Sequence, residues 1–243
     1  MKILFLIVFT YFAITPLSLA LPWSINPSPL TAETLNLRKE SWPDWTLPGP
    51  FEGSKMEENI FYPEWISGDW IVESFDLDQP GQKPFNYEVR FIKDDKKRVV
   101  GDRAFNAKSV GDSFLGDELL YVKDDPSSKN RQVAAFSDNR FLETTIIGRI
   151  QKNDNESTFQ SDELALQIFL NSGVPRITQV ETYSSYELCP NQNIENFKSH
   201  RSEICVEQLQ ALYEAPGDNL FARPIRKSSS RLVFHPKNLR RSF

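Results

Sequence analysis

About ten short segments in which apolar and polar residues alternate fill the chain from Trp70 to Pro236, and they constrain the fold more than any other feature. Alternation with a period of two is typical of strands that bury one face. In residues 140–150, for example, we expect Leu142, Thr144, Ile146 and Ile150 to share a face. The segments are 70–75, 87–91, 98–105, 118–125, 131–136, 140–150, 163–171, 176–186, 206–214, 219–225 and 231–236.

Polar turns separate these segments, and strands do not alternate regularly with helices, so a parallel sheet is not expected. We predict an all-β domain over residues 62–236, folded as an antiparallel up-and-down barrel of about ten strands, because closure removes exposed strand edges. Residues 106–116 fit a short helix between two strands, and 206–214 fit either a strand or a helix. A barrel of this size is either filled by side chains or holds one small ligand.

The first twenty residues have the layout of a cleaved secretory signal. Lys2 precedes an apolar run, Ile3 to Ile14, and Ser18-Leu19-Ala20 places small residues before the expected cleavage point. The alternative is an uncleaved anchor, but the run is shorter than the roughly 20 residues that span a bilayer. We therefore expect residues 1–20 to be removed and the exported product to be soluble.

Residues 21–61 are rich in proline and tryptophan. Proline disfavours helix at the residue before it, so we expect an extended or turn-like arm, with one or two helical turns within 31–40. Large aromatic residues are rare in disordered linkers, and the arm should dock on the domain from Trp42 onward. Residues 237–243 form a basic C-terminal tail.

The two cysteines, Cys189 and Cys205, are separated by a polar segment that fits a loop. An exported chain can keep a disulfide, and this pairing would contribute about 3 kcal/mol on the loop-entropy estimate. The alternative is two free thiols. Export and the even number of cysteines favour the bridge.

The residue content gives no indication of catalysis or of a bound cofactor. The only histidines, His200 and His235, have no nucleophile motif near them, and no cysteine–histidine cluster has zinc spacing. The acidic pairs at 94–95 and 124–125 fit solvated hairpin tips better than calcium sites. With a net charge of −5, nucleic-acid binding is not expected. We therefore expect a non-enzymatic protein without metal or cofactor.

Gly68-Asp69-Trp70, at the start of the first strand and after a proline-led turn, resembles the G-x-W signature of lipocalins and other calycins. The resemblance implies that Trp70 caps the closed end of a barrel under a basic side chain. Arg231, at the start of the last strand, is the first candidate for that side chain, and Arg226 is the second.

A second resemblance covers most of the chain. The segments WPDWTLPGPF, YPEWISGDWIVESF, VVGDRAFN, VKDDPSSKNRQ, FQSDELALQIF and QVETYSSYE occur in this order. Together they resemble a family of exported cyanobacterial proteins of unknown function that has plastid relatives. The resemblance implies a location in the thylakoid lumen or periplasm. It assigns no catalytic residue.

Asp102, Arg103 and Asn106 interrupt an otherwise apolar segment, and Tyr87 and Phe91 should face the barrel interior. One interpretation is that the polar residues anchor the head of a ligand. The other is a buried ion pair that orders the fold.

Two functions follow. The protein either binds a small apolar ligand such as a lipid, pigment or quinone, or it has a filled barrel and acts as an interaction or assembly factor for a photosynthetic complex of the thylakoid membrane.

Overall fold

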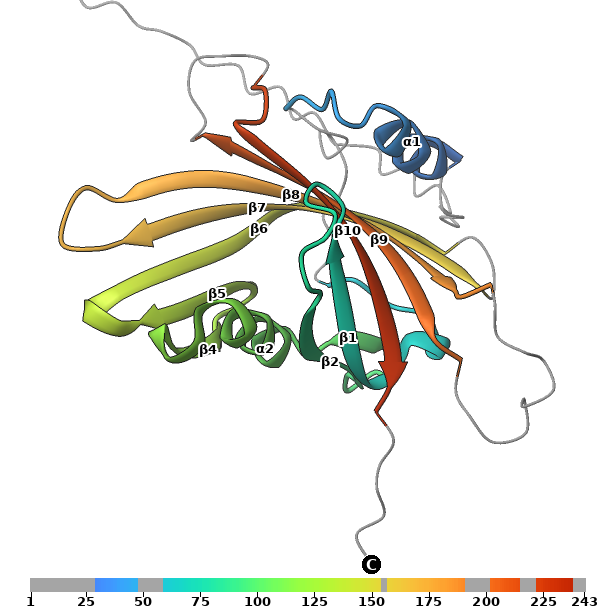
Figure 1. Cartoon of the computed structure of the whole chain (residues 1–243), viewed down its shortest axis with the longest axis horizontal. Helices are drawn as coiled ribbons and strands as arrows, with labels where there is room; N and C mark the ends of the chain where they lie inside the picture. The colour runs from blue at the N-terminus through green and yellow to red at the C-terminus, as the bar shows by residue number, and fades with distance from the viewer. Residues whose placement is uncertain (1–28, 48–58, 154–156, 191–201, 215–221, 238–243) are drawn as a thin grey trace, which may run out of the picture.

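A computed structural model describes residues 29–47, 59–153, 157–190, 202–214 and 222–237. In these residues ten antiparallel strands form one sheet that curls into a half-barrel (Figure 1). The all-β antiparallel fold is thereby confirmed. The strands lie in the order β3-β2-β1-β10-β9-β8-β7-β6-β5-β4, so every pairing except β1–β10 joins consecutive strands. Their bounds are β1 Gly68–Asp76, β2 Phe85–Lys93, β3 Val99–Gly101, β4 Leu119–Asp125, β5 Ser128–Phe136, β6 Arg140–Asn153, β7 Thr158–Leu170, β8 Arg176–Leu188, β9 Ile204–Glu214 and β10 Arg226–Pro236.

A helix, not strand pairing, completes the wall between the two ends of the sheet. The outer strands β3 and β4 do not pair with each other within the described residues. Helix α2, Arg103–Leu115, lies between them and packs against both β2 and β4 (Figure 1). The wall is therefore ten strands plus one helix.

The start of α2 corrects the expected strand at 98–105, because β3 ends at Gly101. Asp102 is the N-cap of the helix, and its carboxylate accepts a hydrogen bond of 3.4 Å from the backbone N–H of Phe105. Aspartate is favoured at this position because it satisfies an N–H group that has no partner within the helix. Arg103 and Asn106 are therefore helical, and they occupy the first turns of α2.

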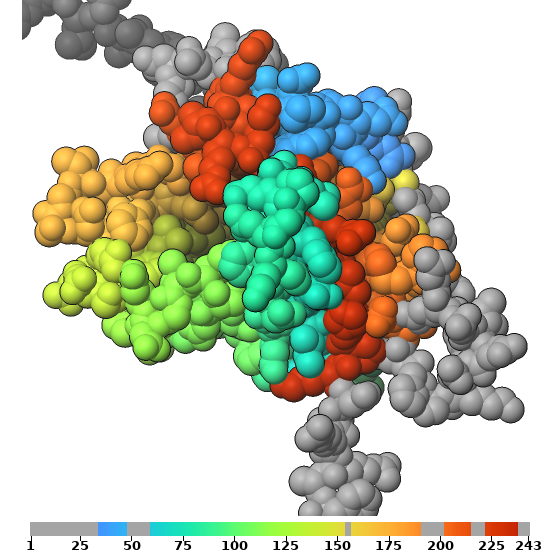
Figure 2. Space-filling model, in the orientation of Figure 1, coloured from blue at the N-terminus to red at the C-terminus, as the bar shows by residue number. Residues whose placement is uncertain are grey.

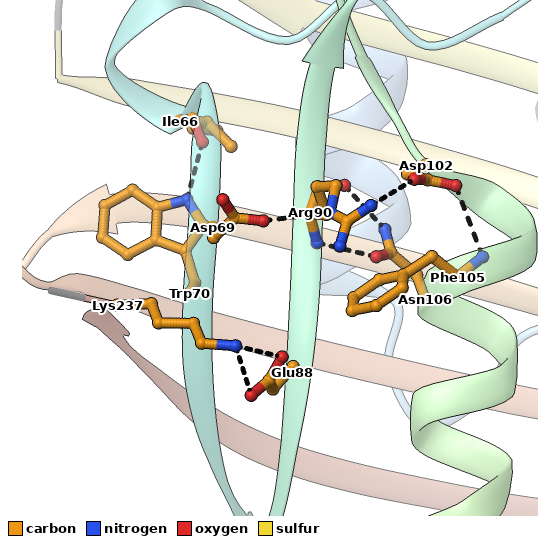
Figure 3. Close-up of polar contacts among 9 residues, drawn as sticks. All are labelled: Ile66, Asp69, Trp70, Glu88, Arg90, Asp102, Phe105, Asn106 and Lys237. Carbon is orange, nitrogen blue, oxygen red and sulfur yellow. Dashed lines mark hydrogen bonds and ion pairs between the residues drawn. The ribbon is translucent and has the colours of Figure 1, made fainter. Parts of the chain in front are cut away.

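Side chains of α2 cover the edge of β2 that β3 leaves exposed. The Asn106 side chain accepts a hydrogen bond from the backbone N–H of Arg90 at 2.7 Å and donates one to the backbone carbonyl of Arg90 at 3.1 Å (Figure 3). The Ser109 hydroxyl accepts a bond from the backbone N–H of Glu88 at 2.9 Å. Unpaired strand edges invite aggregation, and α2 protects this edge by replacing the missing strand.

A β-bulge in β6 reverses which face its side chains occupy. The pairing with β7 shifts between Ile146, opposite Ala165, and Gly148, opposite Leu164, so Ile147 is the extra residue. The prediction that Ile150 shares a face with Leu142 and Ile146 is therefore wrong. Beyond the bulge, Ile150 lies on the convex face, and Arg149 turns to the concave one.

An apolar cluster fills one end of the half-barrel, here called the closed end. A short 3₁₀ helix, Glu64–Ile66, precedes β1 and joins this cluster. Cys189 and Cys205 form a disulfide beside it, which confirms the expected bridge. The buried members of the cluster are Ile60, Ile66, Trp70, Val72, Val89, Phe91, Val99, Phe159, Tyr186, Ile204, Val206, Leu232 and Phe234.

A second cluster lies on the convex face, under helix α1. The one or two helical turns expected within residues 31–40 belong to a longer helix, α1, which covers Pro29–Glu40. Pro29 is its first residue, a position that tolerates proline because the missing N–H has no helical partner. Leu35 and Trp45 are buried against Leu164, Leu209 and Tyr213. The predicted signal peptide and residues 238–243 of the tail lie outside the described residues. No helix of the described part is both long and apolar enough to cross a membrane.

Candidate ligand cavity

Gly68 and Trp70 build the closed end from the start of β1. Gly68 has a φ of 111°, a backbone conformation that favours glycine because it lacks a Cβ. Trp70 is completely buried in the apolar cluster, and its indole N–H donates to the carbonyl of Ile66 at 2.8 Å (Figure 3). Gly68 thus lets the chain pass from the 3₁₀ helix into β1, and the carbonyl of Ile66 in that 3₁₀ helix holds the Trp70 indole in place.

Neither of the two arginines expected over Trp70 lies there. In the β1–β10 pairing Arg231 lies opposite Phe75, while Trp70 lies opposite Pro236. The guanidinium of Arg231 sits over the Phe75 ring, 4.9 Å from its centroid, and the side chain is exposed. Arg226 lies still farther along β10, at the other end of the half-barrel. Neither arginine can reach the indole, because the strand register separates them.

A cavity of about 500 Å³ occupies the opposite end of the half-barrel, here called the open end. The same strands that are apolar at the closed end become polar here: β10 changes from Leu232 and Phe234 to Ser228 and Ser230. In the space-filling view the surface is hollowed between the orange β7–β8 hairpin and the green α2–β4 segment (Figure 2). The lining residues are Ser74, Asp76, Phe85, Tyr87, Val110, Phe114, Gln167, Val180, Gln208, Gln210, Leu212, Arg226, Ser228 and Ser230.

The lining of this main cavity is amphipathic. Strands β1, β9 and β10 contribute most of its serine, glutamine and charged side chains, whereas α2 and β2 contribute valine and aromatic rings. Phe85 and Phe114 pack together with ring centroids 4.2 Å apart, although about half of the Phe114 side chain is exposed. Burial raises the pKa of Tyr87 to about 12, so its hydroxyl stays protonated at neutral pH. The cavity can therefore contact both apolar and hydrogen-bonding groups.

The five residues predicted to bind a ligand lie in three different places. Tyr87 lines the main cavity, whereas Phe91 is packed in the apolar cluster of the closed end. Asp102 and Asn106 hold α2 against β2, and Asp102 forms an ion pair of 3.3 Å with Arg90. The guanidinium of Arg90 in turn stacks 4.0 Å from the Phe105 ring centroid (Figure 3). Arg103, at the same start of α2, lines a separate, smaller cavity together with Asn106.

Sequence reasoning missed the polar wall of the main cavity. Gln208 and Gln210 of β9 alternate with apolar residues in the positions that face inward, and Ser228 and Ser230 of β10 also face inward, within a polar run that precedes Leu232. Inward-facing polar residues at the end of a strand were a usable signal. The ambiguity of residues 206–214 between strand and helix obscured it.

A buried ionic cluster lies on the convex face, away from both cavities. Arg38 of α1 donates two hydrogen bonds to Glu181 of β8, at 2.6 and 2.5 Å, and the Tyr213 hydroxyl donates a third at 2.6 Å. Glu181 and Asp162 are both completely buried. Burial, followed by the charge of Glu181, raises the pKa of Asp162 well above its ordinary value. This cluster fastens α1 to the sheet.

In the described part of the chain, the other candidate residues do not gather into a metal site. The Nδ1 atom of His235 lies 2.8 Å from a carboxylate oxygen of Glu203, and the His235 side chain is partly exposed, whereas His200 lies outside the described residues. Asp94 caps its hairpin, where bonding to Arg98 lowers its pKa. No group of three or more histidine, cysteine, aspartate or glutamate residues in the described ranges could hold a metal ion.

A family model described as a domain of unknown function (DUF6816) matches residues 76–238. The match contains β2 to β10 and α2, and with them the open end and nearly the whole lining of the main cavity. Helix α1 and the Gly68–Trp70 segment lie before it. No curated protein and no solved structure matches the chain.

Proposed function

Because the chain belongs to the DUF6816 family, whose function is unknown, we propose a function from the main cavity itself: non-enzymatic binding of a small amphipathic molecule. The observation that carries this proposal is a hollow of about 500 Å³ with one polar and one apolar side. Ligand pockets commonly have volumes of about 300–1,000 Å³ and combine an apolar lining with a few polar groups. A lipid, quinone or pigment with a polar end has this chemistry.

The amphipathic lining refines the expectation of a purely apolar ligand. An apolar molecule that covered Ser228, Gln208 and Gln210 would exclude water from polar atoms of this wall, although the two glutamine amides already donate to Ser184 and Thr182 at 3.3 and 3.2 Å. Each buried, unsatisfied polar group costs about 1–3 kcal/mol. A molecule with hydroxyl, carbonyl or carboxyl groups on one side avoids this cost, and we propose such a molecule as the ligand.

The test is a titration with fatty acids, quinones and carotenoids. No tryptophan lines the main cavity, so a Phe114→Trp variant would place a fluorescent reporter at its mouth. We expect saturable quenching in this background. A Ser228→Trp substitution would place an indole inside the cavity and should weaken binding at least tenfold. Ile71→Trp is the matched control, because Ile71 is exposed on the convex face of β1. Equal binding by the two variants, or no saturable quenching, would overturn the proposal.

A second candidate function is interaction with a protein partner at the open end. Large apolar side chains are exposed around it, among them Leu120 at 57 %, Val174 at 90 % and Ile225 at 51 %. A photo-crosslinking residue at position 174, compared with one at position 71, would test this in the host. A protein captured only from position 174 supports the partner, and capture of none or capture from both positions rejects it.

We also propose an exported protein that resides in the thylakoid lumen or periplasm. The Cys189–Cys205 bridge supports this proposal, because disulfides persist mainly in oxidising compartments. N-terminal sequencing of the protein from its host should begin at Leu21. A sequence that still contains the first twenty residues would reject it.

A further inference from the structure

A second cavity, of about 200 Å³, lies beside the first turns of α2 and differs in chemistry from the main one. It is mostly polar. Residues from the segment before β1, from the start of α2 and from β5 and β7 surround it. They are Asn59, Ile60, Tyr62, Gly101, Arg103, Asn106, Gln132 and Glu163.

The acidic residue of this cavity already has a cationic partner. Arg149, which the bulge in β6 turns inward, donates to Glu163 from Nε at 2.7 Å and lies 2.6 Å from the same oxygen through Nη2. Its Nη1 donates to Asn130 at 3.1 Å, and only 1 % of its side chain is exposed. The charges of Arg149 and Glu163 therefore compensate each other within the wall.

Arg103 is the cation without such a partner. Its Nη1 lies 4.0 Å from Glu163, beyond hydrogen-bonding distance. The guanidinium makes no hydrogen bond to any residue in the described part of the chain, although only 19 % of the side chain is exposed. A guanidinium carries five N–H donors in a planar arrangement that matches carboxylate and phosphate oxygens. The cavity thus has one excess positive charge and unused donors.

We propose that this cavity is an anion site in which Arg103 binds a carboxylate or phosphate group. Tyr62 lies at its wall, and burial, followed by the nearby Tyr186, raises the Tyr62 pKa and keeps the hydroxyl protonated, but that hydroxyl also hydrogen-bonds with Tyr186. Gln132 is less available, since its amide already donates to Asp124 at 2.6 Å. Arg103 is therefore the group that would hold the anion.

The anion has two possible sources. It is either a free small anion or, if the proposed function holds, the acidic end of the molecule in the main cavity. Arg103, Val110 and Phe114 recur at helical spacing on α2, and the last two line the main cavity. With a rise of 1.5 Å per residue, the axial distance from Arg103 to Phe114 is about 16 Å. A saturated chain of about a dozen carbons would span it.

The experiment compares the wild type with Arg103→Gln and Lys108→Gln. The control also removes one positive charge from α2, but Lys108 forms an exposed ion pair with Asp112 at 2.6 Å. The probes are inorganic phosphate, acetate, dodecanoate and dodecanol, titrated by calorimetry at constant ionic strength. Thermal unfolding of each variant without a probe shows whether it is folded.

Two results would support the anion site. In the first, phosphate or acetate binds the wild type and the Lys108→Gln control equally well and binds Arg103→Gln at least tenfold more weakly. This result would identify a free anion as the ligand. Alternatively, dodecanoate binds at least tenfold more tightly than dodecanol, and Arg103→Gln abolishes that difference, which identifies the acidic end of a longer ligand. Arg103→Lys should restore part of the binding in either case.

Indistinguishable binding of all four probes by Arg103→Gln and Lys108→Gln would overturn the anion site. The two proposals can fail separately. If dodecanoate and dodecanol bind equally well to every variant, and the binding of phosphate and acetate does not depend on Arg103, the main cavity retains its proposed function and the anion site is rejected. If neither long-chain probe binds while phosphate binding depends on Arg103, the anion site stands and the proposed function is rejected.

Discussion

Arg38 and Glu181 show how a single ion pair fixes the place of α1. The carboxylate is completely buried, and its two oxygens accept from Arg38 and Tyr213. Arg38 also stacks on Trp45, 4.6 Å from the ring centroid, and its carbonyl accepts from that indole N–H at 2.7 Å. Burying a carboxylate is favourable only if such partners compensate for its lost hydration.

Replacing Arg38 by methionine should therefore cost about 3–5 kcal/mol, because it leaves an uncompensated charge in the sheet. Urea unfolding followed by tryptophan fluorescence would measure the loss. Lys39→Met is the control, since Lys39 pairs with Glu207 at the surface, where such pairs contribute about 0–1 kcal/mol. The double variant Arg38→Met, Glu181→Gln should recover part of the loss. Equal costs for the Arg38 and Lys39 variants would contradict this account.

Because Asp162 is buried, we expect the free energy of unfolding to fall as the pH rises above the pKa that this carboxyl has in the unfolded chain. Its folded pKa is raised by burial and then by Glu181. The stability that the protonated carboxyl contributes, relative to the ionised one, is fully present below the unfolded pKa of about 3.9. It is lost as the pH rises from there through the folded pKa, by about 1.4 kcal/mol for each unit between the two values.

Asp162→Asn should remove this loss. The free energy of unfolding at pH 8 should be higher in the variant than in the wild type, whereas the two should converge near pH 4. Urea unfolding between pH 4 and pH 8 would measure both slopes. Asp112→Asn, on the exposed surface of α2, should leave the wild-type slope unchanged. Parallel profiles for the wild type and Asp162→Asn would show that Asp162 is not the titrating group.

Among the secondary-structure elements, α2 depends on one close approach to the sheet. A Cβ on Gly111 would lie 2.2 Å from the Leu119 Cδ2 atom of β4. Alanine would favour the helix by about 1 kcal/mol, but overpacking costs about 1–3 kcal/mol. The absence of a Cβ thus lets α2 approach β4 closely enough to complete the wall.

A double-mutant cycle separates these two effects. Gly111→Ala should destabilise the wild type by up to about 2 kcal/mol, because the overpacking cost of about 1–3 kcal/mol exceeds the gain of about 1 kcal/mol in helix propensity. In a Leu119→Ala background the steric conflict disappears, so the same substitution should stabilise the protein by up to about 1 kcal/mol. Chemical unfolding of the four proteins measures both values. The same sign in both backgrounds would mean that α2 does not need this glycine for its contact with β4.

The sequence predicted those elements whose pattern extends over many residues, and it was less successful where a single residue or a distant contact decides the structure. Alternation located the long strands β6 to β8 because each keeps a period of two over many residues. It failed at Asp102, where one capping side chain starts a helix within an apparent strand, and at Ile147, where one extra residue reverses the faces of β6. At α1 the sequence indicated only one or two turns of a helix that packs on distant strands. Such tertiary effects override local propensity.

The two cavities were less accessible to prediction than the strands. Tyr87 and Arg103 were named as ligand residues, and each does line a cavity, but a different one. Their separation depends on α2 filling the gap between β3 and β4, which no strand pattern encodes. Arg149 became a wall residue only through the bulge. Side-chain direction could therefore be predicted along each strand, but not across the gap that the helix fills.

Considered as a whole, the molecule has one packed end and one hollow end, joined by the same strands. The closed end contains Trp70, the apolar cluster and the disulfide, whereas the open end contains the main cavity and α2, none of whose residues is fully buried. Regions with few buried apolar contacts open at lower free energy than the core. Binding in the main cavity should therefore stabilise the open end selectively.

Hydrogen exchange measured by mass spectrometry would test this division. Without ligand, the backbone amides of α2 and β4 should exchange faster than those of β7 to β9, because the helix is held to the sheet by few buried side chains and opens locally. Saturation with an amphipathic probe that quenches the Phe114→Trp reporter should slow exchange in α2, β2 and the open-end halves of β9 and β10. Exchange around Trp70 should not change, because that end is already packed. The Ser228→Trp variant should show the slowed exchange without any probe, since its indole occupies the main cavity. Slowing of exchange that is uniform over the sheet, or confined to the convex face under α1, would show that the probe binds elsewhere and that the hollow end is not the binding site.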